Sequence, residues 1–226
     1  GLWRQFWVPR GDGPAAGAYV RYPGDDLLAL LRLEAGRAGA WVVGEDMGTV
    51  EPHVRDDMAA SGMLGYRVAM RTDPETWPAH AVGGVATHDQ PTVAGTLDGS
   101  DLRALLAAGR STDLRRVEAQ RRLVAGRAGL DPDDPATDRA GVEAAVLAMH
   151  EWIARSPARL VVATLDDAAG VSERPNMPGT VDEWPNWRIA LPAPVEDIFE
   201  SDLARRLVEM FERTRGRRAG TAGCAA

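Results

Sequence analysis

Residues 40–48 of the chain read AWVVGEDMG, a short apolar run rich in β-formers that ends in the acids Glu45 and Asp46. Such a run is typical of a buried strand that leads into an acidic loop. Before it, residues 25–37 (DDLLALLRLEAGR) place leucines on one broad face behind two acids, which predicts a helix. After it, residues 51–60 have proline near the start and glycine beyond the end. This asymmetry predicts a second helix.

The same alternation of strands and helices continues along the chain. Strands that alternate with helices imply a parallel sheet, either doubly wound or closed as a (β/α)₈ barrel, and about four such units make half of a barrel. We find no internal repeat and no linker, so we expect one partial domain over residues 1–215 and a disordered tail over 216–226. The remaining predicted elements are strands at 65–70, 81–86 and 159–165, helices at 101–108, 113–125, 141–155 and 195–213, and a long loop at 170–194.

Composition excludes several classes of function. The formal net charge is −7, and the acids are scattered along the chain, so nucleic acid is not an expected partner. All 26 basic residues are arginine, so Schiff-base and phosphate-loop chemistry lack their amine. We expect neither a membrane segment nor a leader, and the single Cys224 rules out a disulfide framework. A cytoplasmic protein is the expectation.

Several familiar motifs fail in detail. The glycines of residues 11–17 (GDGPAAG) lack the spacing of a dinucleotide-binding turn, and no serine stands in G-x-S-x-G. His150-Glu151 begins an HExxH pattern, but Ala154 occupies the second ligand position. The four histidines are dispersed, so we expect no metal and no cofactor.

Acids follow three of the predicted strands, at Glu45-Asp46, His88-Asp89 and Asp166-Asp167. In a (β/α)₈ barrel these positions lie at the C-terminal mouth, where catalytic groups gather. Paired carboxylates are what glycoside chemistry requires. Each acid also fits an ordinary helix N-cap, and this alternative stays open from spacing alone.

The chain is also rich in tryptophan, with seven among its aromatic residues. Trp184 and Trp187 lie in the long polar loop, where an indole can stack on a sugar. Packing in a core is the alternative role for tryptophan, and it suits Trp3, Trp7 and Trp152 better.

Short motifs recur in order along nearly the whole chain. They are FWVPRG at 6–11, GAYVRYP at 17–23, VVGEDMG at 42–48, THDQPT at 87–92, PNMPGT at 175–180 and NWR at 186–188. Together they resemble the 4-α-glucanotransferases of glycoside hydrolase family 77, also called amylomaltases or disproportionating enzymes. The resemblance implies an α/β fold that is the C-terminal half of a (β/α)₈ barrel with helical insertions, without its N-terminal half.

The resemblance also implies roles for particular residues. Glu45 resembles the family's general acid/base at the end of the fifth barrel strand. Asp89 resembles the carboxylate that binds and distorts the sugar, at the end of the seventh. His88 and Asn176 resemble residues that contact sugar hydroxyls. The family nucleophile is an aspartate of an R-x-D-H motif, and we expect it about four residues before Gly1, outside this chain.

The chain departs from the family pattern at three places. Thr96-Leu97 stand where an aromatic pair is common, which puts one acceptor-side stacking contact in doubt. Gln90 and Met47 replace leucines of similar size.

The implied activity is transfer of α-1,4-glucan segments to the 4-hydroxyl of glucose or another glucan by a retaining double displacement. The expected partners are therefore α-1,4-glucans and maltooligosaccharides. A hydrolase of the same glucans and a non-catalytic glucan-binding remnant are the alternatives. Since the nucleophile is absent and a half-barrel leaves two open parallel edges, we expect the 226 residues alone to be inactive and unstable.

Overall fold

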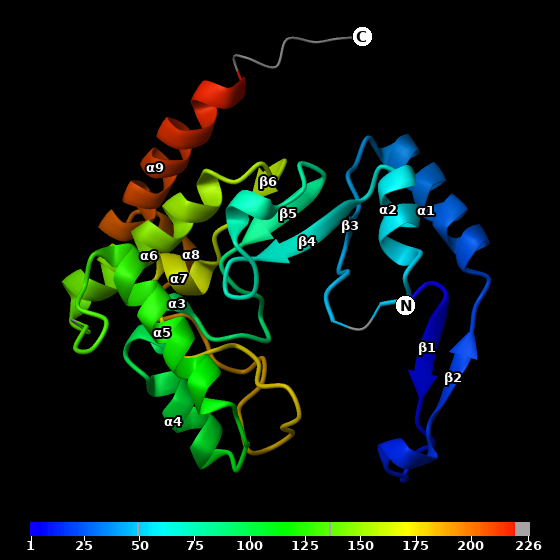
Figure 1. The fold of residues 1–226 in the computed structure, drawn as a ribbon, viewed down its shortest axis with the longest axis horizontal. Helices are drawn as coiled ribbons and strands as arrows, with labels where there is room; N and C mark the ends of the chain where they lie inside the picture. Colours follow the sequence, from blue (N-terminus) through cyan, green and yellow to red (C-terminus); the bar gives the residue numbers. More distant parts are fainter. Residues whose placement is uncertain (49, 136, 220–226) are drawn as a thin grey trace. The chain divides into compact units, whose positions relative to one another are not determined.

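The computed structural model describes residues 1–48, 50–135 and 137–219, which Figure 1 shows as a coloured ribbon. The chain forms two compact units, Gly1–Tyr66 and Arg67–Ala226. The single partial domain expected over residues 1–215 stays a prediction.

The first unit begins with a β-hairpin that the sequence patterns did not reveal. Strands β1 (Arg4–Trp7) and β2 (Ala18–Arg21) pair antiparallel. The connection between them is long and contains the 3-10 turn η1 (Pro14–Ala16) instead of a two-residue turn. Trp7 is 55% exposed on this hairpin, so the interpretation of Trp7 as core packing is wrong.

The rest of the first unit follows the predicted order of helix, strand and helix. Helix α1 (Gly24–Ala38) ends at Gly39, which takes the left-handed conformation with φ of 59°. Strand β3 (Val43–Gly44) and helix α2 (Val54–Ala60) follow, and β3 pairs parallel with the start of β4 (Leu64–Val68). A small core holds them together, formed by Leu28, Met58 and Met63.

The second unit contains the parallel pair of β5 (Ala81–Gly84) and β6 (Leu160–Val161). The segment after β4 joins this pair, since Ala69 N donates to Gly84 O at 3.0 Å. The parallel sheet predicted from the sequence is thus confirmed at both pairings. The 3-10 turn η2 (Pro74–Thr76) connects β4 to β5.

Helices of the second unit pack around α6 (Arg139–Ala154), whose buried face supplies much of its core. Val146, Met149 and Ile153 of this helix are fully buried. In Figure 1, α6 lies between α5 and α9, and both helices contact it. The other helices described are α3 (Val93–Leu97), α4 (Ser100–Ala107), α5 (Leu114–Ala128), α7 (Leu165–Ala168), α8 (Val195–Phe199) and α9 (Asp202–Ala219).

Two predicted elements differ from the structure. The strand expected over 159–165 keeps only two residues as β6, because the Thr164 side chain accepts a hydrogen bond from Asp167 N at 3.2 Å and begins α7. The helix expected over 195–213 is divided into α8 and α9, because Ser201 Oγ accepts from Ala204 N at 3.3 Å and begins a new helix.

The predicted tail also needs correction. Helix α9 continues to Ala219, so residues 216–219 are helical instead of disordered. Residues 220–226 of that tail lie outside the described residues. Among the helices that the structure describes, none is both long and apolar enough to cross a bilayer.

Candidate functional site

Glu45 lies in the first unit, on the loop that follows β3, and the neighbouring Asp46 fixes this loop. Asp46 is 2% exposed. Its side chain accepts hydrogen bonds from Arg55 Nε at 3.1 Å and from Tyr66 N at 3.0 Å. Arg55 Nη2 also donates to the Asp46 carbonyl at 2.9 Å. Asp46 therefore has a structural role, and the adjacent Glu45 is left exposed.

Tyr66 connects the electrostatics of this loop to strand β4. Burial raises the pKa of the Tyr66 phenol, and the negative charge of Glu45 raises it further. The phenol therefore stays protonated at neutral pH, and the Glu45 carboxylate lies close enough for its charge to affect the pKa of Tyr66.

In the second unit, a tight turn after β5 carries His88 and Asp89. Thr87 Oγ1 accepts from Asp89 N at 3.2 Å, and Gln90 Oε1 accepts from Thr87 N at 3.2 Å. Asp89 Oδ1 accepts from Asn176 Nδ2 at 2.6 Å and lies 3.4 Å from His88 Nε2. The structure thus brings together three of the residues singled out in the sequence, although Asn176 is far from the other two along the chain.

The two loop tryptophans take different roles beside this cluster. The Trp187 ring lies 5.2 Å from the His88 ring and is 65% exposed, so its face is open for stacking. Its backbone φ of 59° is unusual for a residue with a side chain. Trp184 is half-buried, and its indole N–H donates to Arg174 O at 3.1 Å. Trp184 therefore supports the loop as well as being a candidate for sugar contact.

A buried ion pair that the sequence analysis did not predict joins this loop to α4, and its arginine also contacts the turn after β5. Arg174 and Asp101 are 6% and 7% exposed. The guanidinium donates to both carboxylate oxygens, at 2.5 and 2.7 Å, and Arg174 Nη1 reaches Asp89 O at 3.3 Å. The only signal in the sequence was an arginine two residues before Asn176, and nothing local indicated its partner on α4.

Helix α3 holds the start of the long loop in place. Thr92 Oγ1 donates to Ser172 O at 3.2 Å, and Ser172 Oγ donates to Asp98 Oδ2 at 2.8 Å. The backbone approaches so closely that a Cβ on Gly95 would lie 2.3 Å from Ser172 O. Only glycine permits this contact.

The NWR motif stabilises the next part of the loop. Asn186 Oδ1 accepts from Met177 N at 2.8 Å, and Asn186 Nδ2 donates to Thr180 Oγ1 at 2.8 Å. These bonds close residues 175–180 into a fixed loop around Asn176. The motif therefore has a structural explanation in the second unit.

Asp89 also lines a cavity of about 520 Å³, together with Gln90, Asp101, Arg116 and Arg174. This size is within the range of small-molecule sites, about 300–1,000 Å³. Hydroxyl-rich ligands suit such a lining, because it offers both charged donors and charged acceptors.

The third pair of acids is structural. Asp167 is 2% exposed and accepts from Val93 N at 2.9 Å, at the start of α3. Its other oxygen lies 3.8 Å from His150 Nε2. Neither acid is the N-cap of the helix that follows the strand, because Thr164 caps α7 and both acids lie in the first turn of that helix instead of at a strand end.

Asp166→Asn is expected to raise the melting temperature slightly at pH 7. Burial raises the pKa of Asp166, and the neighbouring Asp167 adds to this. The folded state therefore holds the proton more tightly, and stability falls as pH rises from the ordinary range of aspartate through the raised pKa. The gain from the amide should be about 1 °C at pH 7, since the group is partly solvated, and absent at about pH 3.

Glu183→Gln is the matched control for this measurement, with the opposite sign. Backbone N–H groups, first that of Val181, lower the pKa of Glu183, so its charged form is favoured by folding. Thermal melts at both pH values should show a loss at pH 7 for Glu183→Gln. A loss at pH 7 for Asp166→Asn would contradict the assignment.

Comparisons with known proteins agree with the motifs. The profile of glycoside hydrolase family 77, described as 4-alpha-glucanotransferase, matches residues 1–195. The chain is 38% identical to the 4-alpha-glucanotransferases of Mycobacterium tuberculosis and Mycobacterium bovis over 235 positions, which cover 92% of this chain and 32% of theirs. It is 29% identical to that of Haemophilus influenzae over 221 positions, covering 89% of this chain and 32% of the relative.

Two solved structures are similar in fold. The amylomaltase from Corynebacterium glutamicum has a TM-score of 0.81 at 30% identity, covering 94% of this chain and 34% of that one. The amylomaltase from Streptococcus agalactiae, solved in complex with acarbose, has a TM-score of 0.63 at 14% identity, covering 95% and 39%. The chain spans about a third of the length of the curated relatives it matches, at 32%. By the match of the family profile over residues 1–195, the chain belongs to the 4-alpha-glucanotransferases of glycoside hydrolase family 77.

Proposed function

We propose that the complete gene product containing this chain transfers α-1,4-glucan segments to the 4-hydroxyl of glucose or another glucan. The observation that carries the proposal is the cluster of His88, Asp89, Asn176 and Trp187, in which a carboxylate, an imidazole and an amide meet beside an exposed indole. Such a combination of hydrogen-bonding groups and an aromatic face suits a sugar ring.

The proposed reaction is a retaining double displacement. An aspartate from outside these 226 residues attacks the anomeric carbon, the bond to the leaving oxygen breaks, and Glu45 gives its proton to that oxygen. Glu45 then takes the proton of an acceptor 4-hydroxyl, whose oxygen attacks the anomeric carbon and releases the aspartate. Asp89 binds hydroxyls of the reacting sugar, and His88 and Asn176 hold Asp89 and contact the sugar with it.

We propose further that the strands β3 to β6 are the last four of a (β/α)₈ barrel. The parallel pairings and the likeness to the Corynebacterium amylomaltase support this. In such a barrel, Glu45 and Asp89 come from the C-terminal ends of strands and belong to one mouth. The 226 residues alone then lack both the nucleophile and half of the barrel, and a reducing compartment, the cytoplasm, remains our expectation from the single cysteine.

Maltotriose is the substrate that tests the proposal. A transferase converts it into glucose and longer oligomers, whereas a hydrolase yields only glucose and maltose. Hydrolysis is the second candidate, because the side chains of His88 and Asp89 are 49% and 43% exposed and water can reach them. A complete gene product that binds maltotriose without converting it would favour a non-catalytic glucan-binding protein.

Asp89→Asn is expected to lower kcat on maltotriose about 10²-fold in the complete gene product. A carboxylate that binds sugar hydroxyls more strongly in the distorted transition state lowers the barrier, and an amide does this less well. Steady-state kinetics with Asp182→Asn as the control, an exposed acid of the same loop, measure the effect. A variant with near-normal kcat, or one that unfolds, would make Asp89 a structural residue.

A further inference from the structure

Asp167 is a buried acid to which the proposed reaction gives no part. Its carboxylate is 2% exposed and comes from the first turn of α7. It accepts a hydrogen bond from Val93 N at 2.9 Å, although the two residues lie 74 positions apart in the chain. Val93 is the first residue of α3, where a backbone N–H has no carbonyl partner within its own helix. This bond therefore joins α7 to α3 at the place where α3 begins.

His150 of α6 supports the other oxygen of this carboxylate. The imidazole is fully buried, and its Nδ1 donates to Val146 O at 2.7 Å, because a carbonyl oxygen can only accept. Nε2 has no hydrogen-bond partner among the described residues and lies 3.8 Å from Asp167 Oδ2. A carboxylate with one oxygen on Val93 N and the other beside a buried ring has little freedom to rotate.

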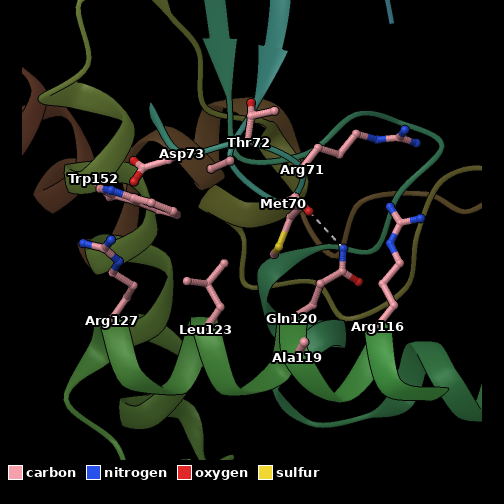
Figure 2. A pocket seen from close by; sticks show the side chains of 11 residues that line it. Met70, Arg71, Thr72, Asp73, Arg116, Ala119, Gln120, Leu123, Arg127 and Trp152 are labelled. Atoms are coloured by element: carbon pink, nitrogen blue, oxygen red, sulfur yellow. Dashed lines mark hydrogen bonds between the residues drawn. The ribbon is translucent and has the colours of Figure 1, made fainter. Parts of the chain in front are cut away.

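Helix α6, which carries this imidazole, is fixed by its neighbours. The Phe211 ring of α9 meets the His150 ring edge-on at 6.2 Å. Trp152 lies on another face of α6 and packs against Arg127 of α5, whose guanidinium is 3.9 Å from the centre of the indole (Figure 2). Asp167 is thus attached to the helical core of the second unit.

The backbone between Val93 and Asp89 is short and stiff. Val93 stands four positions after Asp89. Pro91 has a fixed φ, and Gln90 is 7% exposed and closes the turn by accepting from Thr87 N at 3.2 Å. A shift of Val93 is therefore carried to Asp89 instead of being absorbed along the way.

Other hydrogen bonds attach this turn to the long loop. Thr92 Oγ1 donates to Ser172 O at 3.2 Å, and Arg174 Nη1 donates to Asp89 O at 3.3 Å. These bonds fix the turn relative to the loop, whereas Asp167 fixes it relative to the helices of the core. The two kinds of attachment therefore have separate effects.

We propose that Asp167 is a positioning residue for the transfer reaction. By holding Val93 N, it fixes the end of the turn 87–92 and with it the direction of the Asp89 carboxylate. Asp167 is too buried to touch a substrate, so it acts through Asp89. The inference rests on the proposed function, which gives Asp89 its role.

Asp167→Ala and Val93→Pro test the proposal by removing the same bond from opposite ends. Alanine takes away the acceptor, whereas proline takes away the N–H and suits the first position of a helix. In the complete gene product, each variant should lower kcat on maltotriose about tenfold with little change in KM, because displacing a group that acts in the transition state costs rate. Asp167→Asn should stay within about twofold of the wild type, since its amide oxygen still accepts from Val93 N and its NH₂ group can donate to His150 Nε2. Asp166→Ala, at the neighbouring acid in the same turn of α7, is the matched control and should leave kcat unchanged.

The Asp89→Asn background separates positioning from a general structural role. If Asp167 acts through Asp89, Asp167→Ala should lower kcat by less than about twofold in this background. Equal losses in both backgrounds would overturn the proposal. A loss in Asp167→Asn as large as that in Asp167→Ala would overturn it as well, because the amide keeps the bond to Val93 N.

Amide hydrogen exchange tests the positioning without catalysis. In Asp167→Ala, peptides that cover residues 87–93 should exchange about tenfold faster, whereas peptides of α5 should keep the wild-type rate. Unchanged exchange at 87–93 would overturn the proposal, and so would faster exchange in both regions, which indicates a general loss of stability. Failure of the wild type to convert maltotriose would contradict the proposed function alone, since the exchange rates do not depend on activity.

Discussion

Arg174→Met is expected to lower the free energy of unfolding by about 3–5 kcal/mol. The substitution leaves the carboxylate of Asp101, which is 7% exposed, without its cation. An unpaired buried charge costs far more free energy than the loss of a surface ion pair. Urea unfolding followed by circular dichroism measures the change. It should appear as a lower midpoint, with little change in the slope.

Two further variants show what the pair does. Arg122→Met removes exposed pairs with Glu118, at 2.9 Å, and with Asp133, and should leave the urea midpoint almost unchanged. Replacing Arg174 by Met and Asp101 by Leu together should restore most of the stability, because no unpaired charge remains. Activity should not return with it, since Arg174 Nη1 also donates to Asp89 O. A single variant as stable as the wild type would show that the pair is dispensable.

Glu45→Gln is expected to lower kcat on maltotriose by about 10²–10⁴ in the complete gene product, the usual size of general acid–base catalysis. The amide can neither protonate the leaving oxygen nor take a proton from the acceptor. The loss should be smaller with α-glucosyl fluoride as donor, because fluoride needs little protonation to leave. Kinetics on both donors, with the exposed Asp56→Asn of α2 as control, measure the difference.

Equal losses on the two donors would place Glu45 in substrate binding or folding. A second comparison tests the division of roles in the acidic pair. Because Asp46 accepts from Arg55 and Tyr66, Asp46→Asn should lower stability and reduce activity on both donors alike. Different effects on the two donors would give Asp46 a part in the chemistry.

The long helices could be predicted from sequence because their signals are local. Asp113 caps α5 by accepting from Arg115 N at 3.0 Å, and Gly129 ends it with φ of 71°. Asp138 caps α6 in the same way, through Gly141 N at 2.9 Å. The ends of the strands could not be predicted as well, because the length of a strand depends on pairing partners far away in the chain. Thus residues 160–163 (LVVA) form an unbroken apolar run, yet only Leu160 and Val161 form β6 and pair with β5.

The candidate site could likewise be predicted from the sequence only in part. Motifs identified His88, Asp89 and Asn176, and the structure brings these three together in the second unit. The Arg174–Asp101 pair could not be found, since burial and a partner on another helix leave no trace in the local pattern. The tryptophans show the limit of composition arguments. Trp152 is buried at 8% as a core residue should be, whereas Trp7 is exposed at 55%.

Gly95 affects how experiments that measure tolerance to amino-acid substitution should be interpreted. Even a methyl group there meets the Ser172 carbonyl at 2.3 Å, and Ser172 begins the segment that continues to Arg174. A larger residue at this position would therefore displace α3 from the loop, and with it the contact between Arg174 and the Asp89 carbonyl. A library of random substitutions selected for activity should retain glycine at this position as strictly as it retains Glu45 and Asp89. Ranking positions by intolerance alone would then assign a sugar contact to a residue that has no side chain to offer.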